Sequence, residues 1–137
     1  MRYLVDTCVI SELIKPTPNQ DVVTALRDIH REDSFLSVLT IGELEKGIAK
    51  LPESKKKNRL DDWLNQDLLK QFDGRLLPLD LASARQWGVL QGSQAKGVVL
   101  PAVDGMIAAT AIVHQLTVIT RNVKDMTRCG ATVMNPW

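Results

Sequence analysis

Three acidic residues stand at points where chemistry could be done. Asp6 directly follows a short apolar run, Glu43 lies near the start of a helical pattern, and Asp104 opens another. Carboxylate oxygens are the ligands that Mg²⁺ prefers, and carboxylates held close together stay ionised only beside a cation. If the fold gathers these three side chains, they could hold Mg²⁺ against a phosphodiester and serve its hydrolysis.

Each of the three carboxylates also has a purely structural explanation. Asp6 could cap the helix that follows it, a role in which Asp is favoured. The spacing Thr40-x-x-Glu43 is a capping-box pattern, in which Glu43 would bond the backbone at a helix start. Asp104 lies in the first turn of its helix, where the helix dipole favours negative charge. Taken singly, each residue is better explained by capping, because caps are common and metal sites are few.

Hydrophobic periodicity predicts short strands that alternate with helices. The expected strands are residues 2–5, 34–38, 75–79, 117–120 and 131–134. The expected helices are residues 8–15, 19–32, 40–50, 53–72, 81–96 with Gly97 as C-cap, and 104–115, and residues 122–128 are expected to form a loop or short turn. This order implies a single α/β domain over residues 1–137, with three α/β/α layers around a mostly parallel sheet.

The predicted sheet indicates where two of the polar side chains lie. In such sheets the ligand crevice lies outside the carboxyl ends of the strands. Asp6 follows the first strand and Asn122 follows the strand at 117–120, so both are expected at the same edge. The sequence alone does not bring Glu43 and Asp104 there.

Composition limits the classes of function. The net charge of +1 argues against binding nucleic acid through a large uniform positive field, although local patches remain possible. Only 4% of the residues are aromatic, so the core must be aliphatic. There is no Walker A or GxGxxG pattern, and a two-histidine mechanism would need His30 and His114 to converge, which nothing in their spacing suggests.

The two cysteines and the lengths of the apolar runs bear on zinc binding and on cellular location. Cys8 and Cys129 have no CxxC neighbour, so no zinc site is indicated, and Cys8 is expected to be a small buried residue. No run approaches the length of a membrane span or of a signal-peptide core, so a cytoplasmic protein with no membrane partner is expected.

One basic run has two explanations. Lys55, Lys56, Lys57 and Arg59 are best explained as the solvated start of a helix, and contact with an RNA backbone is the alternative. Arg121, beside the strand at 117–120, is better placed to touch a substrate near the acidic residues.

Four segments in order along the chain resemble the motifs of PIN-domain proteins, and within that family the VapC-type and FitB-type toxins of prokaryotic toxin–antitoxin modules. They are DTCVISE at 6–12, LTIGEL at 39–44, VDGMIAATA at 103–111 and TVITRN at 117–122. Four ordered motifs over essentially the whole chain are much stronger evidence than any one of them.

The resemblance implies a specific chemistry. In that family the acids matching Asp6, Glu43 and Asp104 form a Mg²⁺ or Mn²⁺ site for RNA hydrolysis, in which water attacks phosphorus and leaves a 5′-phosphate and a 3′-hydroxyl. Many members carry a fourth acid at the position of Asn122, whose carbonyl could bind metal-bound water. Asp125 is nearby and is a candidate to compensate for the missing acid. The number of metal ions stays open.

The resemblance also implies supporting residues and partners. Thr7 and Thr120 match small hydroxyl positions that could orient a carboxylate or water, or they could be simple helix-start and strand-end residues. The expected protein is a Mg²⁺-dependent endoribonuclease toxin that cleaves tRNA or rRNA. A homodimer is expected, as is a cognate VapB/FitA-like antitoxin that carries the complex to operator DNA. The alternatives are a PIN nuclease of RNA processing or DNA repair without an antitoxin, and an inactive PIN-fold binding module.

Overall fold

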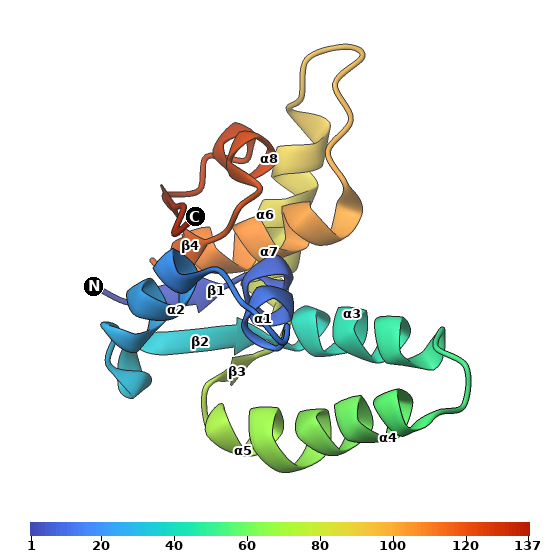
Figure 1. Ribbon diagram of the computed structural model, residues 1–137. Helices are drawn as coiled ribbons and strands as arrows, with labels where there is room; N and C mark the ends of the chain where they lie inside the picture. The colour runs from blue at the N-terminus through green and yellow to red at the C-terminus, as the bar shows by residue number, and fades with distance from the viewer.

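A central five-stranded sheet organises the chain, which the computed structural model describes from residue 1 to residue 137 (Figure 1). The strand order is β3-β2-β1-β4-β5, and every neighbouring pair is parallel. The strands are β1 (Tyr3–Val5), β2 (Ser34–Ser37), β3 (Leu76–Leu77), β4 (Thr117–Ile119) and β5 (Val133–Met134). Helices cover both faces, so the predicted α/β/α architecture with a mostly parallel sheet is confirmed.

The helical segments connect these strands. They are α1 (Thr7–Leu13), α2 (Gln20–Arg27), the 3-10 turn η1 (Arg31–Asp33), α3 (Val38–Ala49), α4 (Lys55–Asp62), the π-helical turn η2 (Trp63–Leu68), α5 (Leu69–Gln71), α6 (Leu81–Gly92), α7 (Ala102–Val113) and α8 (Val123–Arg128). Figure 1 shows α3 and α4 as a hairpin that projects from the body of the molecule. None of these helices has the length and apolar character needed to span a membrane.

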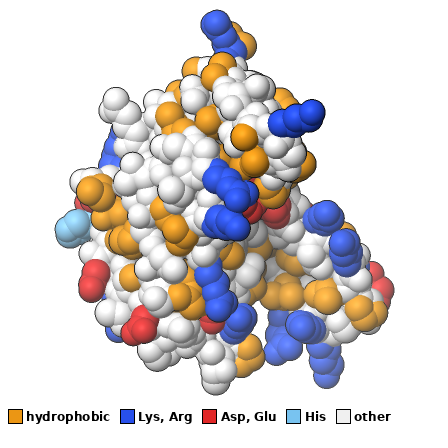
Figure 2. Space-filling view, turned by 90° about the horizontal axis from the view of Figure 1, so that it is seen from above, with side chains coloured by type: hydrophobic (Ala, Val, Ile, Leu, Met, Phe, Trp, Pro, Cys, Tyr) orange, Lys and Arg blue, Asp and Glu red, His pale blue; other side chains and the backbone are white.

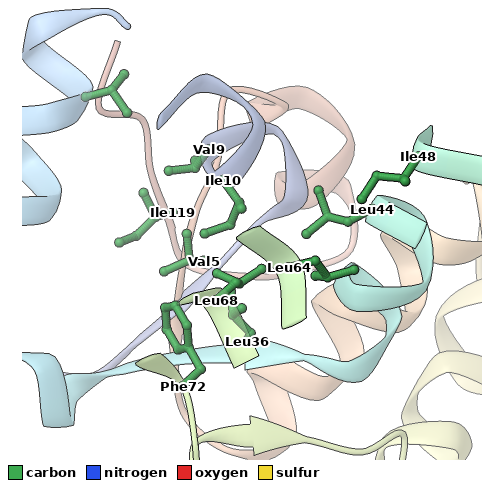
Figure 3. Packing of buried hydrophobic residues seen from close by; sticks show 11 residues of the cluster. Val5, Val9, Ile10, Leu36, Leu44, Ile48, Leu64, Leu68, Phe72 and Ile119 are labelled. Atoms are coloured by element: carbon green, nitrogen blue, oxygen red, sulfur yellow. The ribbon is translucent and has the colours of Figure 1, made fainter. Parts of the chain in front are cut away.

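Alternation along the strands builds two cores, one on each face of the sheet. Successive strand residues point to opposite faces, so Leu4 joins one core and Val5 the other. Figure 3 shows the core that contains Val5, where strand side chains meet those of α1, α3 and η2. The labelled residues are Val5, Val9, Ile10, Leu36, Leu44, Ile48, Leu64, Leu68, Phe72 and Ile119. Both cores are mainly aliphatic, and each fully buried aliphatic side chain contributes about 1.5–3 kcal/mol.

Two helix boundaries differ from the sequence-based expectation. Helix α3 begins at Val38 rather than at position 40, because the Ser37 hydroxyl accepts the Leu39 N–H and caps the helix there. Helix α6 ends at Gly92, and Gly97, expected as its cap, instead has φ +83° in a later loop. That glycine conformation allows the chain to turn before α7.

The remaining differences lie in short segments. Residues 123–128, expected as a loop, form α8, which is stabilised by the fully buried Met126. Six residues are too few for helical periodicity to be recognised. Helix α2 ends at Arg27 and is followed by η1, so the helix expected over 19–32 is broken in two. The helix expected over 53–72 is continuous but contains the π-helical turn η2.

Candidate active site

The acidic residues lie around the carboxyl ends of the central strands. Asp6 leaves β1 and is the N-cap of α1, while its backbone N–H donates to the carbonyl of Ile119 in β4 at 2.9 Å. Its side chain is only 5% exposed. The predicted capping position of Asp6 is therefore observed, and the parallel pairing of β1 with β4 brings the end of each strand to one edge.

Two donors orient the Asp6 carboxylate. The Thr7 backbone N–H donates to Oδ1 at 2.8 Å, and the buried Thr120 hydroxyl donates to Oδ2 at 2.7 Å. The Thr120 oxygen in turn accepts the backbone N–H of Asn122 at 2.9 Å. One carboxylate is thus tied to both central strands, and each of its oxygens has a hydrogen bond.

Glu43 lies in the second turn of α3 and does not cap that helix. The capping-box interpretation of Thr40 and Glu43 is wrong, because Ser37 occupies the cap and Thr40 is inside the helix. Instead, the Thr7 hydroxyl lies 2.6 Å from Glu43 Oε1 and 3.1 Å from the Thr40 hydroxyl. Glu43 is therefore held to α1 across a helix–helix contact, and its carboxylate is directed toward the strand ends.

Asp104 lies in the first turn of α7, as the sequence predicted. The Asn122 amide donates from Nδ2 to Asp104 Oδ2 at 3.0 Å. Burial raises the pKa of Asp104 to about 6, and the negative charges of Asp6, Glu43 and Asp125 add to this effect. Because the negative charges of Asp6 and Glu43 act on it, Asp104 belongs electrostatically to the same cluster as those acids.

The remaining predicted residues lie at the edge of this cluster. Asp125 is in the first turn of α8, 4.0 Å from the guanidinium of Arg128, and its charge contributes to the raised pKa of Asp104. Arg121 is exposed, and its guanidinium lies over the Trp137 ring, 5.3 Å from the ring centroid. Neither side chain hydrogen-bonds to Asp6, Glu43 or Asp104.

A half-buried thiol also borders the cluster. Cys8, expected to be buried, is only partly so, and its sulfur lies 3.7 Å from Asp6 Oδ2 and 3.5 Å from Thr120 Oγ1. Burial is the main cause of a raised pKa of this thiol. A neutral thiol is a poor metal ligand, so the donors at this site are oxygens.

The donor chemistry fits a hard divalent cation. Asp6, Glu43 and Asp104 offer only oxygen ligands, and Mg²⁺ is typically held by one or two carboxylates together with waters and substrate phosphate. The side chains are not drawn together into a ready group of three that could hold an ion as they stand. Burial is the first cause of the raised pKa of Asp104, and the charges of Asp6 and Glu43 add to it, so a cation bound here would favour the ionised carboxylate.

Basic side chains surround the acidic ones. Figure 2 shows acidic side chains in a hollow near the middle of one face, with Lys and Arg side chains on both sides. A cavity of about 460 Å³ opens beside Glu43 and is also lined by Lys46 and Lys50, one and two turns further along α3. This combination suits an anionic ligand that meets the carboxylates through a cation.

The other basic run and the histidines lie elsewhere. Lys57 pairs with Glu53 at 3.2 Å at the start of α4, which fits the interpretation of this run as a solvated helix start. His114 has a partner that the sequence did not indicate, because its Nε2 lies 3.1 Å from Asp80 Oδ2. This pair joins the start of α6 to the end of α7, away from the acidic cluster.

Sequence reasoning missed two residues at the site. The Thr40 hydroxyl was assigned to a helix cap, and Lys46 was not singled out at all. The signal was present for both: Thr40 and Lys46 stand three residues before and after Glu43, so all three share one face of α3.

Comparisons with known proteins agree with the fold described above. A family model described as PIN domain matches residues 3–128. The chain is similar to "Toxin FitB" of Neisseria gonorrhoeae, with 42% identity over 98% of this chain and 97% of the relative. It is also similar to "VapC ribonuclease Y4jK" of Sinorhizobium fredii, with 37% identity over 98% and 96%. A solved structure described as FitAB bound to an IR36 DNA fragment superimposes with a TM-score of 0.92 at 40% identity, covering 98% of this chain and 95% of that one.

Proposed function

This chain belongs to the PIN-domain family, and from that premise we propose that it is a divalent-metal-dependent endoribonuclease, the toxin of a type II toxin–antitoxin module. One observation carries the proposal: Asp6, Glu43 and Asp104 each accept a side-chain hydrogen bond from a residue just beyond the end of β1 or β4, namely Thr120, Thr7 and Asn122 respectively. A relative that covers nearly the whole chain is named a ribonuclease. Residues 1–137 act as one catalytic domain.

Asp6, Glu43 and Asp104 would hold Mg²⁺ or Mn²⁺ through their oxygens. When bound, the ion supplies activation of water and neutralises charge on the scissile phosphate. Before it binds, Asp104 retains a proton more readily than an ordinary carboxyl because its pKa is about 6. Asp104 would be ionised in the metal-bound form, where the charge of the cation would offset its repulsion from Asp6 and Glu43.

Neighbouring polar groups orient these ligands. The hydroxyls of Thr120 and Thr7 donate to Asp6 and Glu43 respectively, which restricts the orientation of both carboxylates. Asn122 donates to Asp104 and brings no charge of its own. A neutral residue at this position weakens any second cation site, and Asp125, paired with Arg128, is the acid available to support one.

The substrate is RNA, and tRNA or rRNA is the class we expect. Lys46 and Lys50 line the cavity beside Glu43, where they can contact the phosphates that flank the scissile bond. Arg121 is held by its stacking on Trp137 close to Asn122 and can contact the same strand. These contacts are local, which accords with a net charge of only +1.

The partners follow from the relatives. A chain similar to "Toxin FitB", and to part of a FitAB assembly bound to DNA, is expected to pair with a cognate VapB/FitA-like antitoxin that carries it to operator DNA. We also propose a homodimer and a cytoplasmic location, both from the family. A short reading frame directly upstream that encodes a DNA-binding protein would favour this role over a PIN nuclease of RNA processing or DNA repair.

Cleavage of total tRNA by the purified protein tests the proposal. The reaction is run with Mg²⁺, with Mn²⁺ and with EDTA, alongside Asp104→Asn and the control Asp62→Asn, an exposed aspartate on α4. Metal-dependent cutting at discrete positions, lost only in Asp104→Asn, is the expected result. No cutting of tRNA or rRNA by the folded, antitoxin-free protein would support an inactive binding module instead.

A further inference from the structure

The geometry points to Thr40 as a positioning residue for Glu43, acting through the hydroxyl of Thr7. The inference rests on the proposed metal site, because the position of Glu43 matters only if that carboxylate is a ligand. Thr40 is completely buried in α3, and Thr7 opens α1, so the contact joins two helices that start from different strands.

A count of protons sets the direction of the hydrogen bonds. The Thr7 hydroxyl has a single proton, and it lies 2.6 Å from Glu43 Oε1 and 3.1 Å from the Thr40 oxygen. An ionised carboxylate can only accept, and it is the stronger acceptor of the two. The heavy atoms place Thr7 as the donor in both contacts, but its one proton can serve only one of them. Thr7 therefore donates to Glu43, and the Thr40 hydroxyl turns to donate to Thr7 in its place.

The Thr40 proton has no competing acceptor. A threonine inside a helix commonly donates to the carbonyl four residues earlier, as Thr110 does to Met106 at 2.8 Å. Thr40 makes no such bond, and its only hydrogen-bond partner is the Thr7 oxygen. Since a buried hydroxyl without a partner costs free energy, Thr40 holds the Thr7 hydroxyl in the one orientation that serves both residues.

Glu43 depends on this arrangement. The bond from Thr7 is the only hydrogen bond to its side chain, whereas Asp6 has two good donors. Thr7 is partly exposed, so without Thr40 its hydroxyl is free to turn toward water. Glu43 would then sample other rotamers, and the conformational entropy lost when its side chain is fixed would weaken cation binding.

The test is a calorimetric titration of the metal-free protein with Mn²⁺. Thr40→Val keeps the branched shape but removes the donor, and Thr40→Ser keeps the donor. We expect Thr40→Val to weaken Mn²⁺ binding about tenfold, the lower end of the range for residues that orient metal ligands, and Thr40→Ser to stay close to wild type. Thermal unfolding in EDTA is measured for each variant, because a purely structural role would lower stability without this difference in affinity.

A double-mutant cycle with Thr7→Val isolates the pathway. If Thr40 acts through Thr7, Thr40→Val causes no further loss of Mn²⁺ affinity once Thr7 is valine. An equal loss in both backgrounds overturns the inference, as does wild-type affinity in Thr40→Val. Glu43→Gln distinguishes failure of the Thr40 inference from failure of the proposed metal site. If Glu43→Gln also binds Mn²⁺ with wild-type affinity, Glu43 is not a ligand and the proposed metal site itself fails. If Thr40→Val does not fold, Thr40→Ala replaces it as the variant without the hydroxyl, and it must lose the Mn²⁺ affinity that Thr40→Ser keeps.

Discussion

Replacing Asp104 by asparagine is expected to stabilise the metal-free protein while it abolishes cleavage. The pKa of Asp104 is raised from 3.8 to about 6 by burial and by neighbouring carboxylates. A folded-state pKa above the unfolded value means that the protonated form is favoured in the native protein. The contribution of Asp104 to stability is therefore complete below pH 3.8 and is lost as the pH rises through 6.

The magnitude follows from the same shift. A difference of about two pKa units corresponds to about 3 kcal/mol, at roughly 1.36 kcal/mol per unit. Asp104 is partly exposed, so solvent screening reduces this to about 1.5 kcal/mol. Loss of a negative charge in the first turn of α7 costs about 0.5 kcal/mol through the helix dipole. The net expectation for Asp104→Asn at pH 7.5 is a gain of about 1 kcal/mol, or about 3–5 °C in Tm.

Calorimetric unfolding in EDTA at pH 7.5 and pH 5 measures this gain, with Asp62→Asn as the matched control. The advantage of Asp104→Asn should shrink by about half at pH 5, where the native carboxyl is mostly protonated. Added Mg²⁺ should raise the Tm of the wild type and leave that of Asp104→Asn unchanged. A variant that is no more stable than wild type at pH 7.5 would refute the reasoning that uncompensated charge is stored at this site.

Three further outcomes are expected. Mn²⁺ affinity, measured by calorimetry, should be about tenfold weaker at pH 5 than at pH 7.5, because protons compete for Asp104 below its pKa of about 6; an affinity independent of pH would contradict this. In the cleavage-deficient Asp104→Asn background, Lys46→Gln should weaken the binding of single-stranded RNA and reduce the slope of log K against log salt by about one. Lys55→Gln should change neither quantity. Equal effects of the two substitutions would show that Lys46 does not contact RNA. Gly105→Ala should lower the free energy of unfolding in urea by about 1 kcal/mol, because the added Cβ would lie 3.1–3.3 Å from Gln91 and Trp87. Gly88→Ala adds its Cβ in open space and should raise the free energy of unfolding by up to about 1 kcal/mol. The reverse order of stabilities would contradict this packing.

Local patterns predicted the framework better than the contacts made across it. The aliphatic runs located all five strands, and the strand-end rule placed Asp6 and Asn122 at one edge. Asp104 could not be placed by that rule, since it reaches the edge from the start of α7 and is fixed there by the Asn122 amide. Its proximity depends on how α7 packs against the sheet, which no local pattern records.

The misassigned threonine shows a second limit. Thr40 and Glu43 have the spacing of a capping box, and a serine three residues earlier competes for the same cap. Ser37 takes it because it stands at the end of β2, where the chain is still extended. The hydroxyl of Thr40 is then free to meet Thr7, and that contact crosses 33 positions of sequence. The metal-binding roles of the acidic residues remain predictions that the titrations above address.

The pairing of β1 with β4 also governs when the site can come into existence. The hydrogen bond from Thr120 to Asp6 spans 114 residues, and β1 is the central strand of the sheet. During synthesis, the first strand therefore waits for nearly the last part of the chain before one of its two neighbours arrives. A nascent or prematurely terminated chain that ends before β4 contains β1, β2 and most residues of the core shown in Figure 3, but it lacks Thr120 and Asn122, whose side chains donate to Asp6 and Asp104. The order of assembly thus delays any activity of this site until β4 and Asn122 have been synthesised.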